Sequence, residues 1–144
     1  MTTTTLPDNG QGLALKLAIN ISLAVQMLAF SEGLLLAARA GIEPALAAGI
    51  MTQSPMGSPM LKARAPLVLD LPKEAWFDVS LMQKDLRLAL ESARDLKVRL
   101  PSTAVADELL STAREHGYEH RDIAAFYRVL SELVEGASRA PDSP

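Results

Sequence analysis

The chain has 144 residues, of which 49% are hydrophobic and 22% charged, and its net charge is −3. This length and composition suit one globular domain, and the acidic balance argues against nucleic-acid binding, which needs a basic face. Cysteine is absent and only two histidines are present, which excludes disulfides, cysteine nucleophiles and histidine-rich or thiolate metal sites. The abundance of Leu and Ala is typical of helices.

The predicted elements begin with one long apolar helix. Residues 1–9 are Thr-rich, lack the features of a secretion signal and are expected to form a disordered leader. Residues 12–40 contain no proline and precede Gly41, so they predict a helix of about 44 Å. Its apolar residues lie on nearly every side, and we expect a second chain or a second domain to cover part of it. A lysine, an asparagine and a glutamine interrupt the apolar run, which favours a buried helix of a soluble protein over a transmembrane helix.

Four shorter helices are expected after the long one, and the sequence shows no strand alternation. A Pro-, Gly- and Ser-rich segment at 54–59 predicts a loop, and residues 62–72 are expected to be irregular or to form one helical turn. Ser80 is the expected N-cap of the second short helix. The predicted fold class is all-α, with one helical domain at 10–135 and a loose tail at 136–144. The short helices are expected at 43–53, 81–96, 103–116 and 122–135.

The first candidate site lies at the start of the long helix. Lys16 and Asn20 are four residues apart, so they share one helix face. Such a lysine is often only a side chain that extends along apolar surface to reach water. However, the positive end of the helix dipole and apolar neighbours both favour the neutral amine, the form that a general base needs. Gly10 and Gly12 do not form a dinucleotide fingerprint, because the third glycine and the preceding strand are missing.

The second candidate site lies near the start of the 81–96 helix, in the sequence Gln83-Lys84-Asp85-Leu86. On its own, the adjacent lysine and aspartate are typical of a solvated charge pair at a helix start. Phe77 is the aromatic residue that precedes this helix. This second segment therefore indicates a site only when it is considered together with the first.

Together, Gly-x-Gly-x₃-Lys-x₃-Asn and, about 68 residues later, Gln-Lys-Asp-Leu-x-Leu-Ala resemble the β-hydroxyacid dehydrogenase family, which includes 3-hydroxyisobutyrate dehydrogenase. The pattern is closest to that of glyoxylate/succinic semialdehyde reductases. The resemblance extends from Gly10 to Leu133 and includes Ser58-Pro59, Gly117 and Asp122. It covers only the C-terminal, all-helical half of such enzymes. It therefore implies the fold of the 6-phosphogluconate dehydrogenase C-terminal-like domains.

The resemblance implies roles for six residues in two groups. Lys16 would be the catalytic proton donor and acceptor, and Asn20 would hold both Lys16 and the substrate. Gly12 and Phe77 would lie at the substrate. The residues expected beside the cofactor are Lys84 and Asp85.

The implied function is that of an NAD(P)-dependent oxidoreductase, with hydride transfer between nicotinamide and a small hydroxyacid or aldehyde acid. The sequence contains no Gly-rich βαβ unit, so the chain is expected to lack the Rossmann domain, to use NAD or NADP only together with one, and to be inactive alone. The expected partners are a second copy, a separate Rossmann-domain protein and a small hydroxyacid, with no nucleic acid, membrane or metal. The expected location is cytoplasmic. The alternative is a non-catalytic helical dimerisation or binding module.

Overall fold

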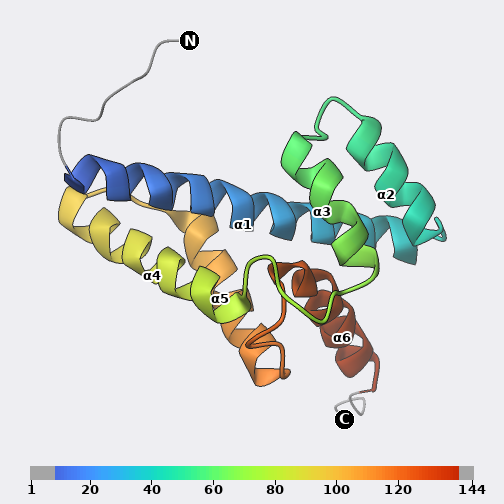
Figure 1. Cartoon of the computed structure of the whole chain (residues 1–144). Coiled ribbons are helices and arrows are strands. Elements are labelled where there is room, and N and C mark those ends of the chain that lie inside the picture. Colours follow the sequence, from blue (N-terminus) through green and yellow to red (C-terminus); the bar gives the residue numbers. More distant parts are fainter. Residues whose placement is uncertain (1–8, 140–144) are drawn as a thin grey trace.

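The computed structural model describes residues 9–139, so residues 1–8 of the expected leader and 140–144 of the expected tail lie outside the described residues. Helices dominate this part of the chain, and no strand occurs in it, which confirms the all-α fold class (Figure 1). The elements are α1 (Asn9–Arg39), α2 (Pro44–Gln53), α3 (Pro59–Leu69), α4 (Val79–Leu96), α5 (Pro101–Glu115), the short 3₁₀ helix η1 (Ile123–Ala125) and α6 (Phe126–Arg139).

Helix α1 is the axis of the molecule and contacts all of the other helices. Figure 1 shows α4 beside the N-terminal half of α1 and α2 with α3 beside its C-terminal half. At 31 residues it confirms the predicted long helix, beginning three residues earlier than expected. It ends before Gly41, whose φ of 97° is accessible to glycine but strained for other residues.

In this chain alone α1 is buried on only part of its surface, and its covering by a second chain or a second domain stays a prediction. Leu13, Leu15 and Ile19 are between 49% and 61% exposed, and Leu36 is 74% exposed. The reason is that α4 and α5 cover only one side of the N-terminal half. By length and composition, Gly10–Arg39 could also cross a membrane, a test that core helices of soluble proteins pass as well.

Helix α3 occupies residues for which only one turn at most was expected, so that prediction is wrong. Ser58 caps the helix by accepting a hydrogen bond from the backbone N–H of Leu61, and Pro59 fits its first turn. Pro66 lies inside the helix and removes one backbone hydrogen bond. Burial of Leu61 and Val68 against the core offsets this loss. The loop ahead of α3 is confirmed, and Gly57 is required there, because a Cβ would lie 1.8 Å from the carbonyl oxygen of Thr52.

Two other helix ends differ from the sequence expectation. The N-cap of α4 is Asp78 rather than Ser80, because the Asp78 carboxylate accepts the backbone N–H groups of Ser80 and Leu81. The last expected helix begins as η1, capped by Asp122, and continues as α6. Since α6 extends to Arg139, residues 136–139 are helical rather than part of a loose tail.

The hydrophobic core forms where α1 meets α4, α5 and α6. Its largest apolar side chains are less than 2% exposed. They come from α1, α3, α4, α5 and the η1–α6 segment, so these elements pack as one unit around the long helix. The residues are Met27, Leu34, Val68, Val79, Met82, Leu86, Leu110, Ile123, Phe126 and Val129.

Candidate functional site

The two candidate segments meet where α1 passes α4. The Asn20 side chain is 9% exposed, and its Nδ2 donates a hydrogen bond of 2.7 Å to Oδ2 of Asp85. A short bond to a carboxylate is among the stronger hydrogen bonds of proteins. The structure therefore brings together two of the six predicted site residues, although they lie 65 positions apart in the sequence.

Lys16 lies one helical turn before Asn20, on the same face of α1. Its side chain is exposed, so the described residues do not provide the apolar surroundings that were expected around the amine. A Cβ added at Gly12 would meet no atom within 4 Å. Lys16 and Gly12 therefore lie on an open surface, where another molecule or another part of the protein has room to approach.

Lys84 and Asp85 are adjacent in sequence but face different sides of α4. Consecutive residues of a helix are about 100° apart, so only Asp85 points towards α1. Lys84 is exposed and borders a hollow of about 300 Å³ together with Arg87, Glu91 and Arg114. The structure therefore does not bring Lys84 into contact with Asn20.

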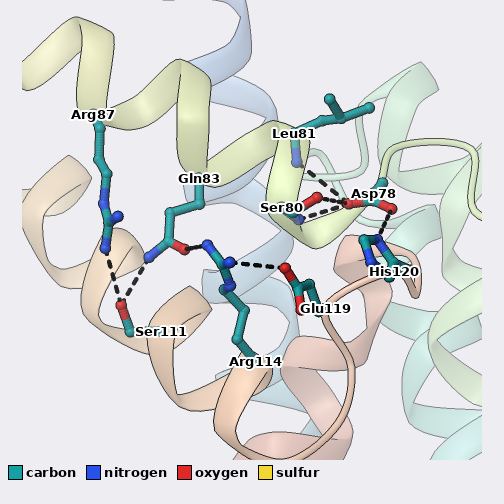
Figure 2. A network of polar contacts seen from close by, with 9 residues as sticks. All are labelled: Asp78, Ser80, Leu81, Gln83, Arg87, Ser111, Arg114, Glu119 and His120. Atoms are coloured by element: carbon teal, nitrogen blue, oxygen red, sulfur yellow. Dashed lines mark hydrogen bonds and ion pairs between the residues drawn. The ribbon is translucent and has the colours of Figure 1, made fainter.

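Beside this hollow, a buried polar network joins α4 to α5, and sequence reasoning missed it (Figure 2). Gln83 is 1% exposed. Its Nε2 donates to Oγ of Ser111 at 2.7 Å and to Oδ1 of Asp107 at 3.0 Å. Its Oε1 accepts a hydrogen bond from Nη1 of Arg114 at 3.0 Å, and Arg114 also pairs with Glu119 at 2.7 Å. The available signal was a glutamine placed at an apolar position of an amphipathic helix.

Phe77 lies two residues ahead of α4, whose first residue, Val79, is about 9 Å of helix rise from Asp85. Its ring is half-buried and packs against the core. Its backbone N–H donates to Oδ2 of Asp122 at 2.9 Å, and its carbonyl oxygen accepts from the N–H of Ile123 at 3.0 Å. The position of Phe77 is therefore fixed by the segment that precedes α6.

Two carboxylates near the histidines have altered acidity. Burial alone would raise the pKa of Asp78, but hydrogen bonds from Ser80, His120 and the N–H of Leu81 hold the pKa below its ordinary value (Figure 2). Burial would also raise the pKa of Glu132, but hydrogen bonds from His116 and Tyr118 hold this pKa below its ordinary value. Both acids therefore favour the charged form in the folded chain.

No group of three or more metal-binding side chains occurs within residues 9–139. Where α1 meets α4, the polar groups of Lys16, Asn20 and Asp85 are an amine, an amide and a carboxylate. These groups can move a proton and orient a hydroxyl group.

Residues 10–130 match the family model described as the NAD-binding domain of NADP-dependent 3-hydroxyisobutyrate dehydrogenase. Because the match covers most of the chain, the protein belongs to this family. The family lies within the NAD(P)-dependent hydroxyacid dehydrogenases.

Individual relatives agree with this assignment. The chain is 33% identical over 131 residues to 2-hydroxy-3-oxopropionate reductase of Escherichia coli, covering 91% of this chain and 45% of the relative. It is 30% identical to the chloroplastic glyoxylate/succinic semialdehyde reductase 2 of Arabidopsis thaliana, covering 87% of this chain and 35% of the relative. A crystal structure of 3-hydroxyisobutyrate dehydrogenase from Salmonella typhimurium superposes with a TM-score of 0.74 at 28% identity, covering 80% of this chain and 40% of that one. The chain thus spans less than half the length of these relatives.

Proposed function

We propose that this chain is the catalytic and dimerisation domain of an NAD(P)-dependent oxidoreductase that acts on a small hydroxyacid or aldehyde acid. The observation that carries the proposal is the hydrogen bond between Asn20 and Asp85. It joins the two motif segments, with Lys16 one turn away on the same face of α1. Membership of the dehydrogenase family supports the same reaction class.

Lys16 and Asn20 act on the substrate hydroxyl group in this proposal. During oxidation the neutral amine of Lys16 accepts the hydroxyl proton, and during reduction the ammonium returns it. The amide of Asn20 is held by Asp85, so its carbonyl oxygen is free to orient the ammonium or the hydroxyl group. Acid–base assistance of this kind contributes about 10²–10⁴ in rate. The nicotinamide cofactor supplies or accepts the hydride when it is bound.

The described residues fit one wall of a nicotinamide site. The space beside Gly12 is open, and the exposed Lys84 can pair with an anionic group. Within residues 9–139 there is no strand, and therefore no βαβ unit to hold the pyrophosphate. We propose that a Rossmann domain outside these residues completes the site.

The same covering domain would supply the surroundings that Lys16 lacks in this chain. Leu13, Leu15 and Ile19 surround the lysine and are about half exposed. A domain packed on them buries apolar area and removes water from the amine, which favours its neutral form. The exposed apolar start of α1 and the exposed lysine therefore have one explanation.

A second apolar face lies at the other end of α1 and suits a second copy of the chain. It consists of exposed apolar side chains of α2 and its flanks, of which Ile50 and Met56 also line a hollow of about 630 Å³ that Phe30 and Met51 border. Large exposed apolar surface marks interaction sites. Because this dimer face is separate from Lys16, pairing leaves the catalytic face open. The exposed residues of the dimer face are Leu36, Ile42, Leu46, Ile50 and Met56.

The function is tested with a chimera in which this chain replaces the matching 45% of the E. coli reductase. We expect the chain alone to give no turnover with NADH or NADPH, and the chimera to reduce 2-hydroxy-3-oxopropionate or a related aldehyde acid. A folded chimera without turnover on any of these acids would favour the alternative, a non-catalytic dimerisation module. The exposure of Lys16 is the observation that favours this non-catalytic alternative. A cytoplasmic location stays a prediction.

A further inference from the structure

Asp122 is a fully buried carboxylate that accepts three backbone N–H groups. Its Oδ2 accepts those of Trp76 and Phe77, both at 2.9 Å. Its Oδ1 accepts that of Ala124 at 2.8 Å. A buried carboxylate is tolerated when its oxygens are hydrogen-bonded and its charge is compensated. These bonds satisfy the first condition and connect two segments that lie about 45 residues apart.

The charge of Asp122 is compensated by Arg64 of α3. The guanidinium nitrogen Nη1 lies 3.9 Å from Oδ2 of Asp122. The same guanidinium lies over the indole ring of Trp76, with Cζ 5.6 Å from the ring centroid, a cation–π contact. Arg64 is largely buried, and its Nη1 makes no hydrogen bond within the described residues. Arg64 thus acts as the counter-ion of Asp122 and packs over the Trp76 ring.

Capping of η1 does not explain the whole arrangement around Asp122. The cap needs only Oδ1, which accepts the N–H of Ala124. Oδ2 instead accepts the backbone N–H groups of Trp76 and Phe77. Two backbone hydrogen bonds also join these segments. The N–H of Ile123 donates to the carbonyl oxygen of Phe77, and the N–H of Val79 donates to the carbonyl oxygen of Arg121. Phe77 is thereby held through both its N–H and its carbonyl group.

The anchored backbone determines which way the two aromatic rings face. The Trp76 side chain is 59% exposed and lies against Arg64. The Phe77 ring turns inward and packs against the core. Residues 76 and 77 form a bend ahead of α4, and without the bonds to Asp122 the backbone of this bend would be free to rotate and to move the Phe77 ring.

We propose that Asp122 is a positioning residue that acts through Phe77, fixing this ring at the edge of the substrate cleft. The inference rests on the proposed function, because only an oxidoreductase of that class would bind a substrate beside Phe77, the place that the family resemblance implies for this ring. The physical part of the claim concerns this chain alone: the Asp122 carboxylate determines the position of the Phe77 ring.

The physical part is tested by ¹⁹F NMR of the full chain labelled with fluorophenylalanine. The chain has three phenylalanines, and Phe30 and Phe126 are buried, so each signal can be assigned by substitution. We expect Asp122→Asn to shift or broaden the Phe77 signal while the other two remain, because the amide group presents N–H to a backbone N–H. Asp70→Asn removes an exposed carboxylate and is the matched control. An unchanged Phe77 signal in a folded Asp122→Asn chain would overturn the inference.

A milder variant covers the case in which Asp122→Asn does not fold. Arg64→Met keeps the three N–H bonds of Asp122 but removes its counter-ion. We expect a smaller change of the Phe77 signal, with the Phe30 and Phe126 signals unaffected. Loss of dispersion in all three signals, or no change in any, would contradict a specific link between this ion pair and Phe77.

The functional part is tested by a double-mutant cycle on kcat/KM in the chimera. Asp122→Asn is expected to lower kcat/KM about tenfold in the unmodified chimera and less than about twofold when Phe77 is already alanine. Equal effects in both backgrounds would show that Asp122 acts as a general structural residue, which overturns its role through Phe77. A chimera without any turnover would instead refute the proposed function, and the NMR result then decides the physical claim independently.

Discussion

The side-chain amide of Asn20 donates a 2.7 Å hydrogen bond to the carboxylate of Asp85, linking α1 to α4 across 65 residues of sequence. One oxygen of Asp85 is thereby committed to holding the amide. The bond fixes how the segment that carries Lys16 lies against the segment that carries Lys84. A change at either partner is therefore expected to affect both segments.

Removing this bond should destabilise the chain measurably. We expect Asn20→Ala to lower the free energy of unfolding by about 1.5–3 kcal/mol, since it removes a hydrogen bond to a half-buried charged group. In a double-mutant cycle, Asn20→Ala should cost much less when Asp85 is already alanine. Urea unfolding measures both values, and Ser22→Ala, at an exposed site two residues away, is the control. Additive effects would show that the two side chains are not coupled.

The buried network around Gln83 should be more sensitive than exposed amides. Gln83→Ala removes one hydrogen-bond partner each from Arg114 and Ser111, which keep their contacts with Glu119 and Arg87, and it opens a cavity at a buried position. We therefore expect a loss of about 2–4 kcal/mol. Gln53→Ala, at the exposed end of α2, should change stability by less than about 0.5 kcal/mol. The comparison uses urea unfolding of both variants. Similar small losses in the two variants would mean that the network contributes little.

Acid should destabilise the fold through Asp78 and Glu132. Both carboxyl groups have pKa values lowered by hydrogen bonds in the folded chain. Their contribution to the free energy of unfolding is therefore complete above the unfolded pKa values of about 4. It is lost as the pH falls through the lower folded values. Asp78→Asn should therefore flatten the decrease of melting temperature between about pH 5 and pH 2. An unchanged slope would remove Asp78 from this dependence.

The chain should form a dimer through the apolar face on α2. Sedimentation equilibrium is expected to give about twice the monomer mass of 15.4 kDa. Leu46→Glu places a charge on that face and should shift the equilibrium to monomer, whereas Leu15→Glu, near Lys16, should not. A wild-type monomer that is stable on dilution would refute the dimer.

Sequence patterns predict where the helices lie better than they predict which helices contact each other. The lack of proline between residues 12 and 40 predicted α1, and this helix ends before Gly41 as expected. Helix α3 was missed because its proline-rich sequence is typical of a loop, while its stability comes from core burial of Leu61 and Val68. Such tertiary contributions are not encoded in local propensity.

In the candidate site, too, local spacing predicts which residues share a helix face but not which residues of different helices meet. Helical spacing placed Lys16 and Asn20 on one face, but only the packing of α1 against α4 could show that Asn20 meets Asp85 and that Lys84 points elsewhere. Spacing alone also could not show that Lys16 is exposed, because exposure depends on which surfaces other elements cover. The roles of the six site residues stay predictions.

The central claim is that Lys16 is the acid–base group of an oxidoreductase, and its most direct test is kcat of the chimera that carries Lys16→Met. Since Lys16 is exposed, we expect the melting temperature of the chain to change little, while kcat falls at least about a hundredfold. Lys84→Met should mainly raise KM for the cofactor, and Lys62→Met, at another exposed lysine, should leave kcat within about twofold of the unmodified chimera. A Lys16→Met chimera that retains full kcat would contradict the account.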